Sequence, residues 1–351
     1  MSVMELPKSK NELVLISGVN GYIASQTAKS FLDAGYSVRG TARSLASTSN
    51  LIRALQLYVD AGRFEVVEVK DILVPGAFDE AVREVNAVAH MASPVSQFFT
   101  DPDPIIRTAV EGTLSILQSA LAYGGTQLRS VVLMSSIGAV MEPKTGPYTF
   151  IEADWNNVSE SEVTRLGKDT PGGHIYRASK VAAERAFWKF RDENHPNITM
   201  TAVNPTYVCG PPFVLPDDPS NINETVRAVW KILSGQPIPP PLGASGSFVD
   251  VRDVAELMVF GVEKSHVANG QRYIACAGVG GEQAIADILN EAYPNRELDR
   301  GEPGKGYLPT FGFAKDGPNV DASKASQARG KEWIGYKQSV LDAAKAFEHY
   351  L

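Results

Sequence analysis

Short apolar runs alternate with amphipathic segments along the first 205 residues of the chain. Residues 13–16 read Leu-Val-Leu-Ile, the continuous apolar run expected of a strand that is buried on both faces. Residues 22–34 carry apolar positions at helical spacing, and Gly35 ends that pattern. By the same signals we predict strands at 36–41, 64–69, 87–90, 130–134 and 198–203, and helices at 53–61, 78–85, 104–123 and 175–194. This alternation predicts an α/β fold with a doubly wound parallel sheet.

The pattern becomes irregular after Asn204. Two proline-rich stretches flank a predicted helix, and further strands and helices follow: the stretches are 209–219 and 237–241, the strands 248–250 and 272–275, and the helices 221–233, 281–292 and 337–350. We therefore expect two regions. The first comprises residues 1–205, with 247–276 returning to it. The second is smaller, mostly helical and formed by 206–246 and 277–351, and we expect it to lie over the carboxyl edge of the sheet, where open α/β sheets bind ligands.

Composition and charge narrow the class of protein. The 351 residues are 44% hydrophobic and 21% charged, as in an ordinary globular protein, and the net charge of −7 argues against nucleic acid or an anionic membrane as the main partner. The two cysteines, Cys209 and Cys276, are far apart, and neither they nor the five histidines show a metal-ligand spacing. We expect no metal and a reducing compartment. Because the N-terminus lacks an apolar segment and no apolar run could span a bilayer, we expect cytoplasmic residence.

A glycine turn follows the first strand and opens the first helix. Gly18 permits a tight turn, Gly21 lets the backbone approach a pyrophosphate at the helix N-terminus, and Ala24 is small enough for close packing of helix and strand. In this strand–turn–helix context the motif predicts dinucleotide binding and a Rossmann-type first region. The predicted contacts come from Gly18, Val19, Asn20, Gly21, Tyr22 and Ile23.

The end of the second strand distinguishes NADP from NAD. NAD enzymes usually carry an acid there, which binds the ribose 2′-hydroxyl. This chain has Arg43 instead, whose planar guanidinium suits a 2′-phosphate, so the predicted cofactor is NADP(H). For Arg39, a cofactor contact and a solvated surface position remain equal alternatives.

Three residues can carry proton transfer. Tyr176 and Lys180 lie four residues apart, which is one turn on the same helix face, and a nearby cation favours the phenolate of a tyrosine whose ordinary pKa is about 10. This spacing alone is a weak signal. Ser136, where the fifth strand ends, would hold a substrate carbonyl oxygen at the same sheet edge. The order of glycine turn, strand-end serine and Tyr-x-x-x-Lys is specific.

The chain resembles the extended short-chain dehydrogenases/reductases, of the epimerase/dehydratase-like and dihydroflavonol-reductase-like branch. Within that branch it is most similar to fungal NADPH-dependent methylglyoxal/isovaleraldehyde and carbonyl reductases. The matching stretches, which extend over nearly the whole chain, are 17–24, 38–44, 70–72, 90–94, 133–136, 176–180, 202–205 and 249–255. The resemblance implies that Ser136, Tyr176 and Lys180 are catalytic, that Tyr176 and Lys180 also contact the cofactor, and that Asn204 and Asp253 are structural. Further cofactor contacts implied by it are Asp71, Ile72, Met91, Ala92, Pro205 and Val208.

Departures from the family pattern bear on the substrate. Met141 stands where dihydroflavonol reductases carry an asparagine that grips flavonoid hydroxyls, so a flavonoid would leave polar groups unpaired there. We expect an apolar substrate pocket lined by Val95, Phe98, Met141, Tyr207 and Phe213. Each of these residues could equally be a core residue.

These observations predict an NADPH-dependent reductase of aldehydes and ketones, which is stereoselective and acts on a small apolar or aryl carbonyl compound as monomer or homodimer. Two alternatives remain. A nucleotide-sugar epimerase or dehydratase on the same fold would place an acid after the second strand, and Arg43 counts against it. A non-enzymatic NADP(H)-sensing regulator would typically lack the pair of Tyr176 and Lys180.

Overall fold

The computed structural model describes residues 6–241 and 246–351. The chain divides into two compact units, each of which is described by itself. Unit 1 comprises Met1–Glu142, Trp155–Asn204 and Ala255–Arg272, and unit 2 comprises Pro143–Asp154, Pro205–Val254 and Tyr273–Leu351. These bounds differ from the expected ones because 143–154 belong to unit 2 and the returning segment is 255–272.

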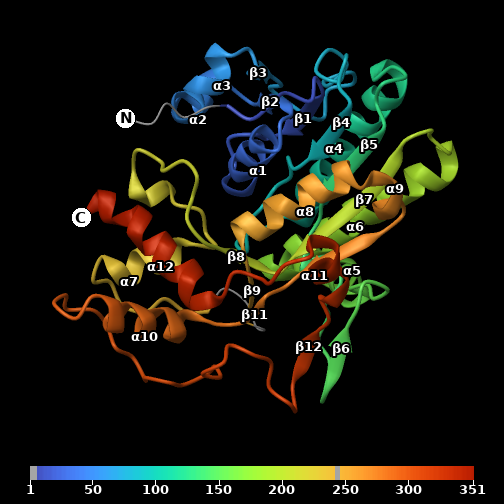
Figure 1. The fold of residues 1–351 in the computed structure, drawn as a ribbon. Coiled ribbons are helices and arrows are strands. Elements are labelled where there is room, and N and C mark those ends of the chain that lie inside the picture. Colours follow the sequence, from blue (N-terminus) through green and yellow to red (C-terminus); the bar gives the residue numbers. More distant parts are fainter. Residues whose placement is uncertain (1–5, 242–245) are drawn as a thin grey trace. The chain divides into compact units, whose positions relative to one another are not determined.

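A seven-stranded sheet has the strand order β10-β7-β5-β4-β1-β2-β3, and its neighbouring pairs from β7 to β3 are parallel (Figure 1). The strand order reverses between β1 and β4, which is the switch point where doubly wound sheets bind their ligands. The strands are β1 (Leu13–Ser17), β2 (Ser37–Ala42), β3 (Phe64–Glu68), β4 (Ala87–His90), β5 (Ser130–Met134), β7 (Thr199–Pro205) and β10 (Arg272–Ala275). The predicted Rossmann-type sheet is confirmed.

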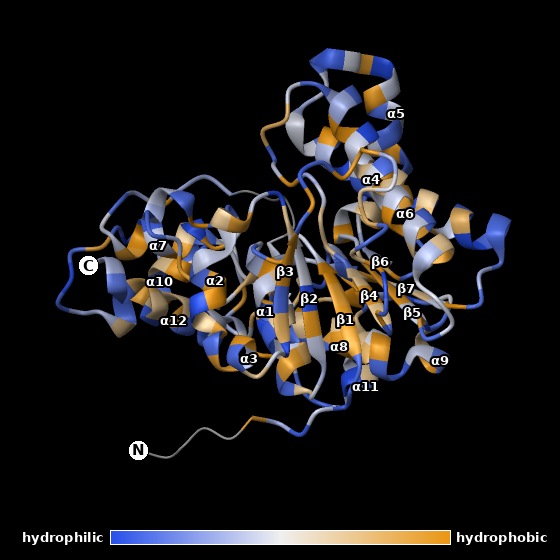
Figure 2. Cartoon of the chain, turned by 90° about the horizontal axis from the view of Figure 1, so that it is seen from above, coloured by the Kyte–Doolittle hydropathy of each residue, from blue (hydrophilic) through white to orange (hydrophobic). Residues whose placement is uncertain are grey.

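The apolar runs form strands because both faces of the sheet are covered. All residues of β4 and β5 are buried, and β1 is buried from Val14 to Ser17. Figure 2 shows β1 mostly in the hydrophobic colour. The helices of unit 1 are α1 (Tyr22–Asp33), α2 (Ser49–Ala54), α3 (Gln56–Asp60), α4 (Pro102–Tyr123), α5 (Asn157–Leu166), α6 (Gly172–Asn194) and α9 (Ser265–Ala268), and α8 (Val251–Glu263) begins in unit 2 and continues into unit 1.

Two long helices of unit 1, α4 and α6, pack against each other. The Asp101 carboxylate caps α4 by accepting from Asp103 N at 3.2 Å, and Pro102 begins the helix, where its missing N–H has no cost. Helix α6 follows Pro171 and ends at His195, which adopts the left-handed conformation. This helix carries the predicted tyrosine and lysine.

Unit 2 contains two small sheets. One has the order β11-β9-β8, and the other pairs β12 with β6 in parallel. Its cysteines, Cys209 and Cys276, are buried and free. The strands are β6 (Tyr148–Phe150), β8 (Tyr207–Cys209), β9 (Ser247–Asp250), β11 (Gly278–Val279) and β12 (Pro318–Val320), and the helices are α7 (Arg227–Leu233), α10 (Glu282–Ala292), α11 (Ser323–Arg329) and α12 (Tyr336–Phe347). Within the described ranges, no helix is long and apolar enough to cross a membrane.

Three predicted helices differ from the structure. Residues 78–85 form successive turns, although Phe78, Val82 and Val85 are buried at helical spacing. The positive φ of 63° at Glu84 ends any helical course there. The predicted helix 53–61 is two short helices that meet at Leu55, and only 227–233 of the predicted helix 221–233 are α-helical. The predicted strand 248–250 is β9, whereas α5, α8, α9 and α11 and the strands β6, β8, β11 and β12 were not predicted.

Candidate active site

The turn after β1 depends on two glycines, Gly18 in the turn itself and Gly40 on the neighbouring strand β2. Gly18 has a φ of +67°, and a Cβ on it would lie 3.2 Å from Ala92 Cα, which follows β4. On β2, a Cβ at Gly40 would lie 2.4 Å from Val19 Cγ1, so Gly40 makes room for the turn above it. The Gly21 N–H donates to Gly18 O at 3.0 Å and closes the turn. The predicted glycine turn therefore lies directly against the segment after β4.

The N-terminus of α1 suits an anion. Gly21 is its N-cap, no side chain among the described residues caps it, and its first turn carries no acidic residue. Asn20 Nδ2 donates to Ser47 Oγ at 3.2 Å, which ties the turn to the segment after β2. A helix of twelve residues whose N-terminus has no side-chain cap among the described residues, beside a glycine cradle, fits the pyrophosphate of a dinucleotide.

A buried hydroxyl joins the turn to Met91 and Ala92. Ser17 Oγ accepts the N–H groups of Met91 at 2.8 Å and Ala92 at 2.9 Å, so its own proton is donated to His90 Nδ1 at 2.9 Å. The ring proton of His90 is therefore on Nε2, toward Thr113 Oγ1 at 3.5 Å. Burial, and secondarily the charge of Lys180, lower the pKa of His90 to about 3, which keeps the ring neutral. Ser17 and His90 were not predicted as site residues, although both end strands at the switch point.

The two arginines of the β2 segment differ in their surroundings. Arg43 follows the last residue of β2, is exposed, and pairs with no acid in the described residues, so its guanidinium remains available to a phosphate. Arg39 lies in mid-strand opposite Leu15, where its Nε donates to Glu65 Oε1 at 2.6 Å and its Nη1 to Arg83 O at 2.7 Å. These contacts support a structural role for Arg39.

The other predicted cofactor contacts are distributed over both units. Asp71 and Ile72 follow β3, where Asp71 Oδ1 accepts from Leu73 N at 2.9 Å. Pro205 ends β7 and Val208 lies in β8, so both belong to unit 2.

The predicted triad comes together within unit 1. Ser136 follows β5 and is buried, and its Oγ accepts from Gly138 N at 3.0 Å and from the Tyr176 hydroxyl at 3.2 Å. Lys180 lies one turn after Tyr176 on α6, with its Nζ 5.7 Å from the centroid of the tyrosine ring. The predicted Ser136 is therefore the serine that contacts the phenol, whereas the Oγ of its neighbour Ser135 donates to Glu184 at 2.5 Å.

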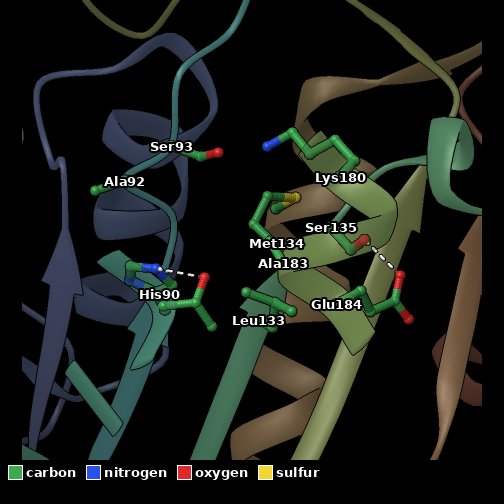
Figure 3. Close-up of a pocket in the computed structure, with 10 residues that line it drawn as sticks. His90, Ala92, Ser93, Leu133, Met134, Ser135, Lys180, Ala183 and Glu184 are labelled. Carbon is green, nitrogen blue, oxygen red and sulfur yellow. Dashed lines mark hydrogen bonds between the residues drawn. The ribbon is translucent and has the colours of Figure 1, made fainter. Parts of the chain in front are cut away.

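Lys180 is held in a nearly dry place. It is 5% exposed, and burial lowers the pKa of its ammonium to about 8. A cavity of about 10 Å³, which has room for one water molecule, separates it from His90 and Ser93. Figure 3 shows Ser93 Oγ and Lys180 Nζ pointing toward one another. The buried Ser93 Oγ has no partner among the described residues and so fits a polar ligand atom.

The residues of the predicted substrate pocket are also divided between the two units. Val95 and Phe98 lie on the loop between β4 and α4 and are 56% and 70% exposed. This loop rests on the start of α6, because a Cβ at Gly172 would lie 2.4 Å from Gln97 O. Met141 is half-buried in unit 1, while Tyr207 and Phe213 lie in unit 2, where the Tyr207 hydroxyl donates to Glu224 O at 3.2 Å. Burial is the largest cause of a strongly raised pKa at Tyr207, so this phenol stays neutral.

Comparison with known proteins gives relatives over nearly the full length. The chain is 30% identical to an NADPH-dependent methylglyoxal reductase of Saccharomyces cerevisiae, over 94% of this chain and 96% of the other. It is also 30% identical to aldehyde reductase 2 of Sporidiobolus salmonicolor, over 95% of each chain. The crystal structure of yeast methylglyoxal/isovaleraldehyde reductase with NADPH aligns with a TM-score of 0.82 at 29% identity, over 96% of this chain and 98% of the other.

A family model matches residues 14–276, which include the glycine turn, Arg43 and the triad. The predicted family is confirmed: the chain belongs to the NAD dependent epimerase/dehydratase family.

Proposed function

We propose that this protein is an NADPH-dependent reductase that converts aldehydes and ketones to alcohols. The observation that carries the proposal is the 3.2 Å contact between the Tyr176 hydroxyl and Ser136 Oγ, with buried Lys180 behind the tyrosine. Two hydroxyl groups this close together can both hydrogen-bond to one carbonyl oxygen of a substrate. The full-length relatives named as methylglyoxal and aldehyde reductases support the same reaction.

NADPH is the cofactor that fits the residues present. Residues 18–23 would hold its pyrophosphate and Arg43 its 2′-phosphate, and the other predicted contacts are Asp71, Ile72, Met91, Ala92, Pro205 and Val208. When bound, its nicotinamide supplies the hydride that reduces the carbonyl carbon. Two features of the described residues support this assignment: the N-terminus of α1 has no side-chain cap, and Arg43 is exposed and pairs with no acid.

Ser136 orients the carbonyl oxygen. Its Oγ accepts from Gly138 N–H and from the Tyr176 hydroxyl, which uses both lone pairs and leaves its own proton free to donate. No acceptor for that proton lies among the described residues. The carbonyl oxygen of the substrate takes that place and is polarised by the hydrogen bond.

Tyr176 delivers the proton. As negative charge develops on the carbonyl oxygen of the substrate, the phenol turns its proton from Ser136 Oγ to that oxygen, which yields the alcohol and leaves a phenolate. Lys180 stabilises that phenolate because an ammonium in a dry site interacts strongly with a nearby anion. Bulk water then reprotonates the tyrosine after product release.

The loop that rests on the start of α6 bears on the substrate class. Val95 and Phe98 expose apolar surface on a loop that rests on the first turn of α6. This supports a carbonyl compound with an alkyl or aryl arm. We extend the proposal to stereoselective reduction, cytoplasmic residence, and action as a monomer or homodimer.

Substitution of the phenol tests the proposal. Tyr176→Phe removes the transferable proton and keeps the ring, so kcat falls about 100- to 10,000-fold, the usual contribution of a general acid, while NADPH binding stays nearly intact. NADPH oxidation is measured over a panel of aldehydes and ketones, with chiral analysis of the alcohols, and NADPH binding by fluorescence. Near-wild-type turnover by this variant would show that Tyr176 is not the proton donor. A panel without any substrate, despite NADPH binding, would favour a regulator.

A further inference from the structure

The buried carboxylate of Glu184 on α6 accepts hydrogen bonds from residues next to the proposed catalytic serine, Ser136. Glu184 lies one turn after Lys180 and two turns after Tyr176, and it is completely buried. Its oxygens accept from Ser135 Oγ at 2.5 Å, Asn204 Nδ2 at 2.8 Å and Trp188 Nε1 at 3.2 Å. Figure 3 shows the Ser135 hydroxyl reaching across to this carboxylate. The residue joins the end of β5 to the helix that carries the phenol.

The charge of Glu184 is matched by one cation. Arg272, which is 8% exposed, donates from Nε to Glu184 Oε1 at 2.6 Å and from Nη2 to Oε2 at 3.2 Å. Its guanidinium also stacks over Trp155, with Cζ 4.1 Å from a ring centroid. A buried carboxylate without such a partner would be strongly unfavourable. A pair of apolar residues could fill the same space without loss of stability. The ion pair of Glu184 and Arg272 therefore suggests a role other than stabilising the fold.

The link to the reaction passes through Asn204 at the end of β7. Its Nδ2 donates both to Glu184 Oε2 at 2.8 Å and to the backbone oxygen of Ser136 at 3.2 Å. The backbone of the catalytic serine and the hydroxyl of its neighbour Ser135 are therefore both fixed to one carboxylate. That carboxylate is carried by the same helix as Tyr176, so it sets the position of Ser136 relative to the phenol.

We infer that Glu184, neutralised by Arg272 and bridged by Asn204, is a positioning residue for proton transfer. It acts through Ser136 and touches neither substrate nor cofactor, and the inference rests on the proposed role of Ser136. Because small displacements of reacting groups lower rates steeply, loss of this carboxylate lowers kcat without weakening NADPH binding.

Unit 2 supplies a matched control. Asp253 and Arg329 form a buried ion pair, at 1% and 2% side-chain exposure, and the Asp253 carboxylate also accepts from Ile334 N at 2.9 Å. Asp253→Asn thus removes a buried, paired carboxylate that makes no bond to Ser135, Ser136 or Asn204. This variant reports what such a loss does to the fold alone.

The test is a double-mutant cycle in which Glu184→Gln is introduced into the wild type and into Ser136→Ala. We expect Glu184→Gln to lower kcat per folded enzyme about tenfold in the wild type, within the range that misplacement of reacting groups produces. In Ser136→Ala, which is itself about 100-fold slower, it should have no further effect, since no hydroxyl remains to be positioned. Asp253→Asn lowers stability but leaves kcat per folded enzyme unchanged in both backgrounds.

An equal fold-loss from Glu184→Gln in both backgrounds overturns the inference, because a purely structural role acts regardless of Ser136. Wild-type turnover by Ser136→Ala alone instead refutes the proposed function of that serine, so the two failures are distinguishable. If Glu184→Gln does not fold, Asn204→Ala takes its place in the same cycle, since it breaks the bridge to Ser136 and leaves the pair with Arg272 intact.

Discussion

The proton-transfer site and the loop between β4 and α4 (residues 91–101) are neighbours in unit 1, yet they are built in opposite ways. Ser136 and Lys180 are 6% and 5% exposed and lie on packed elements. On the loop, Val95 and Phe98 are more than half exposed, and the backbone is anchored at its far end on Gly172. The proposed catalytic residues are therefore held by the core, while the proposed substrate surface lies on an exposed loop. Substitutions in the site should lower kcat, and substitutions in the loop should change KM.

The largest effect that sharpens this comparison is expected at Lys180. Lys180→Met keeps the length of the side chain but removes the ammonium that stabilises the phenolate, so kcat falls about 100- to 1000-fold, as on loss of other preorganised stabilising groups. Steady-state kinetics with saturating NADPH measure it. Lys189→Met, an exposed lysine on the same helix, is the control and retains full kcat.

The same substitution should stabilise the fold. The pKa of Lys180 is about 8 in the folded protein, below its ordinary value of 10.5, so burying the charge opposes folding by about 3 kcal/mol at pH 7. The folded state binds fewer protons than the unfolded state between pH 8 and 10.5. The penalty is therefore fully present below pH 8 and is relieved as the pH rises through that window. Urea denaturation without cofactor should show Lys180→Met as the more stable protein at pH 7 and a shrinking difference toward pH 10. A constant difference would show that the charge is not the cause.

The sequence predicted the parts of this site that depend on local geometry. A glycine that needs positive φ, a strand-end serine and a Tyr–Lys pair one helical turn apart each leave a short pattern. The hydrogen bonds between Ser17 and His90 and between Ser135 and Glu184 leave no such pattern, because they join residues 73 and 49 positions apart that meet only in the folded sheet. The helix predicted at 78–85 was wrong because a local pattern misled. Its apolar residues are buried at helical spacing, but the backbone there forms turns instead of a helix.

Arg43 is expected to produce the next largest effect. Arg43→Ala removes a charge-assisted contact to the 2′-phosphate worth about 1.5–3 kcal/mol, so NADPH binds about 10- to 100-fold more weakly while NADH binding is unchanged. Titration of both cofactors measures this selectivity. Arg165→Ala removes an equal charge from an exposed site paired with Glu162 and controls for the general field. Equal weakening for both cofactors would exclude recognition of the phosphate by Arg43.

The smallest effect that we expect is also the one that most directly tests the loop. Phe98→Ala removes apolar surface but breaks no packing, because the ring is 70% exposed, so the free energy of unfolding changes by less than about 0.5 kcal/mol. The KM of an aryl ketone should rise about three- to tenfold, equivalent to about 0.7–1.4 kcal/mol of lost apolar contact, with kcat unchanged. A small aldehyde that cannot reach the ring should keep its KM. Leu57→Ala, an equally simple loss of exposed apolar surface on α3, should alter neither substrate. If Phe98→Ala lowered kcat for both substrates and left KM alone, the loop would be part of the machinery that positions the reacting groups, and the separation between a fixed site and a variable rim would fail.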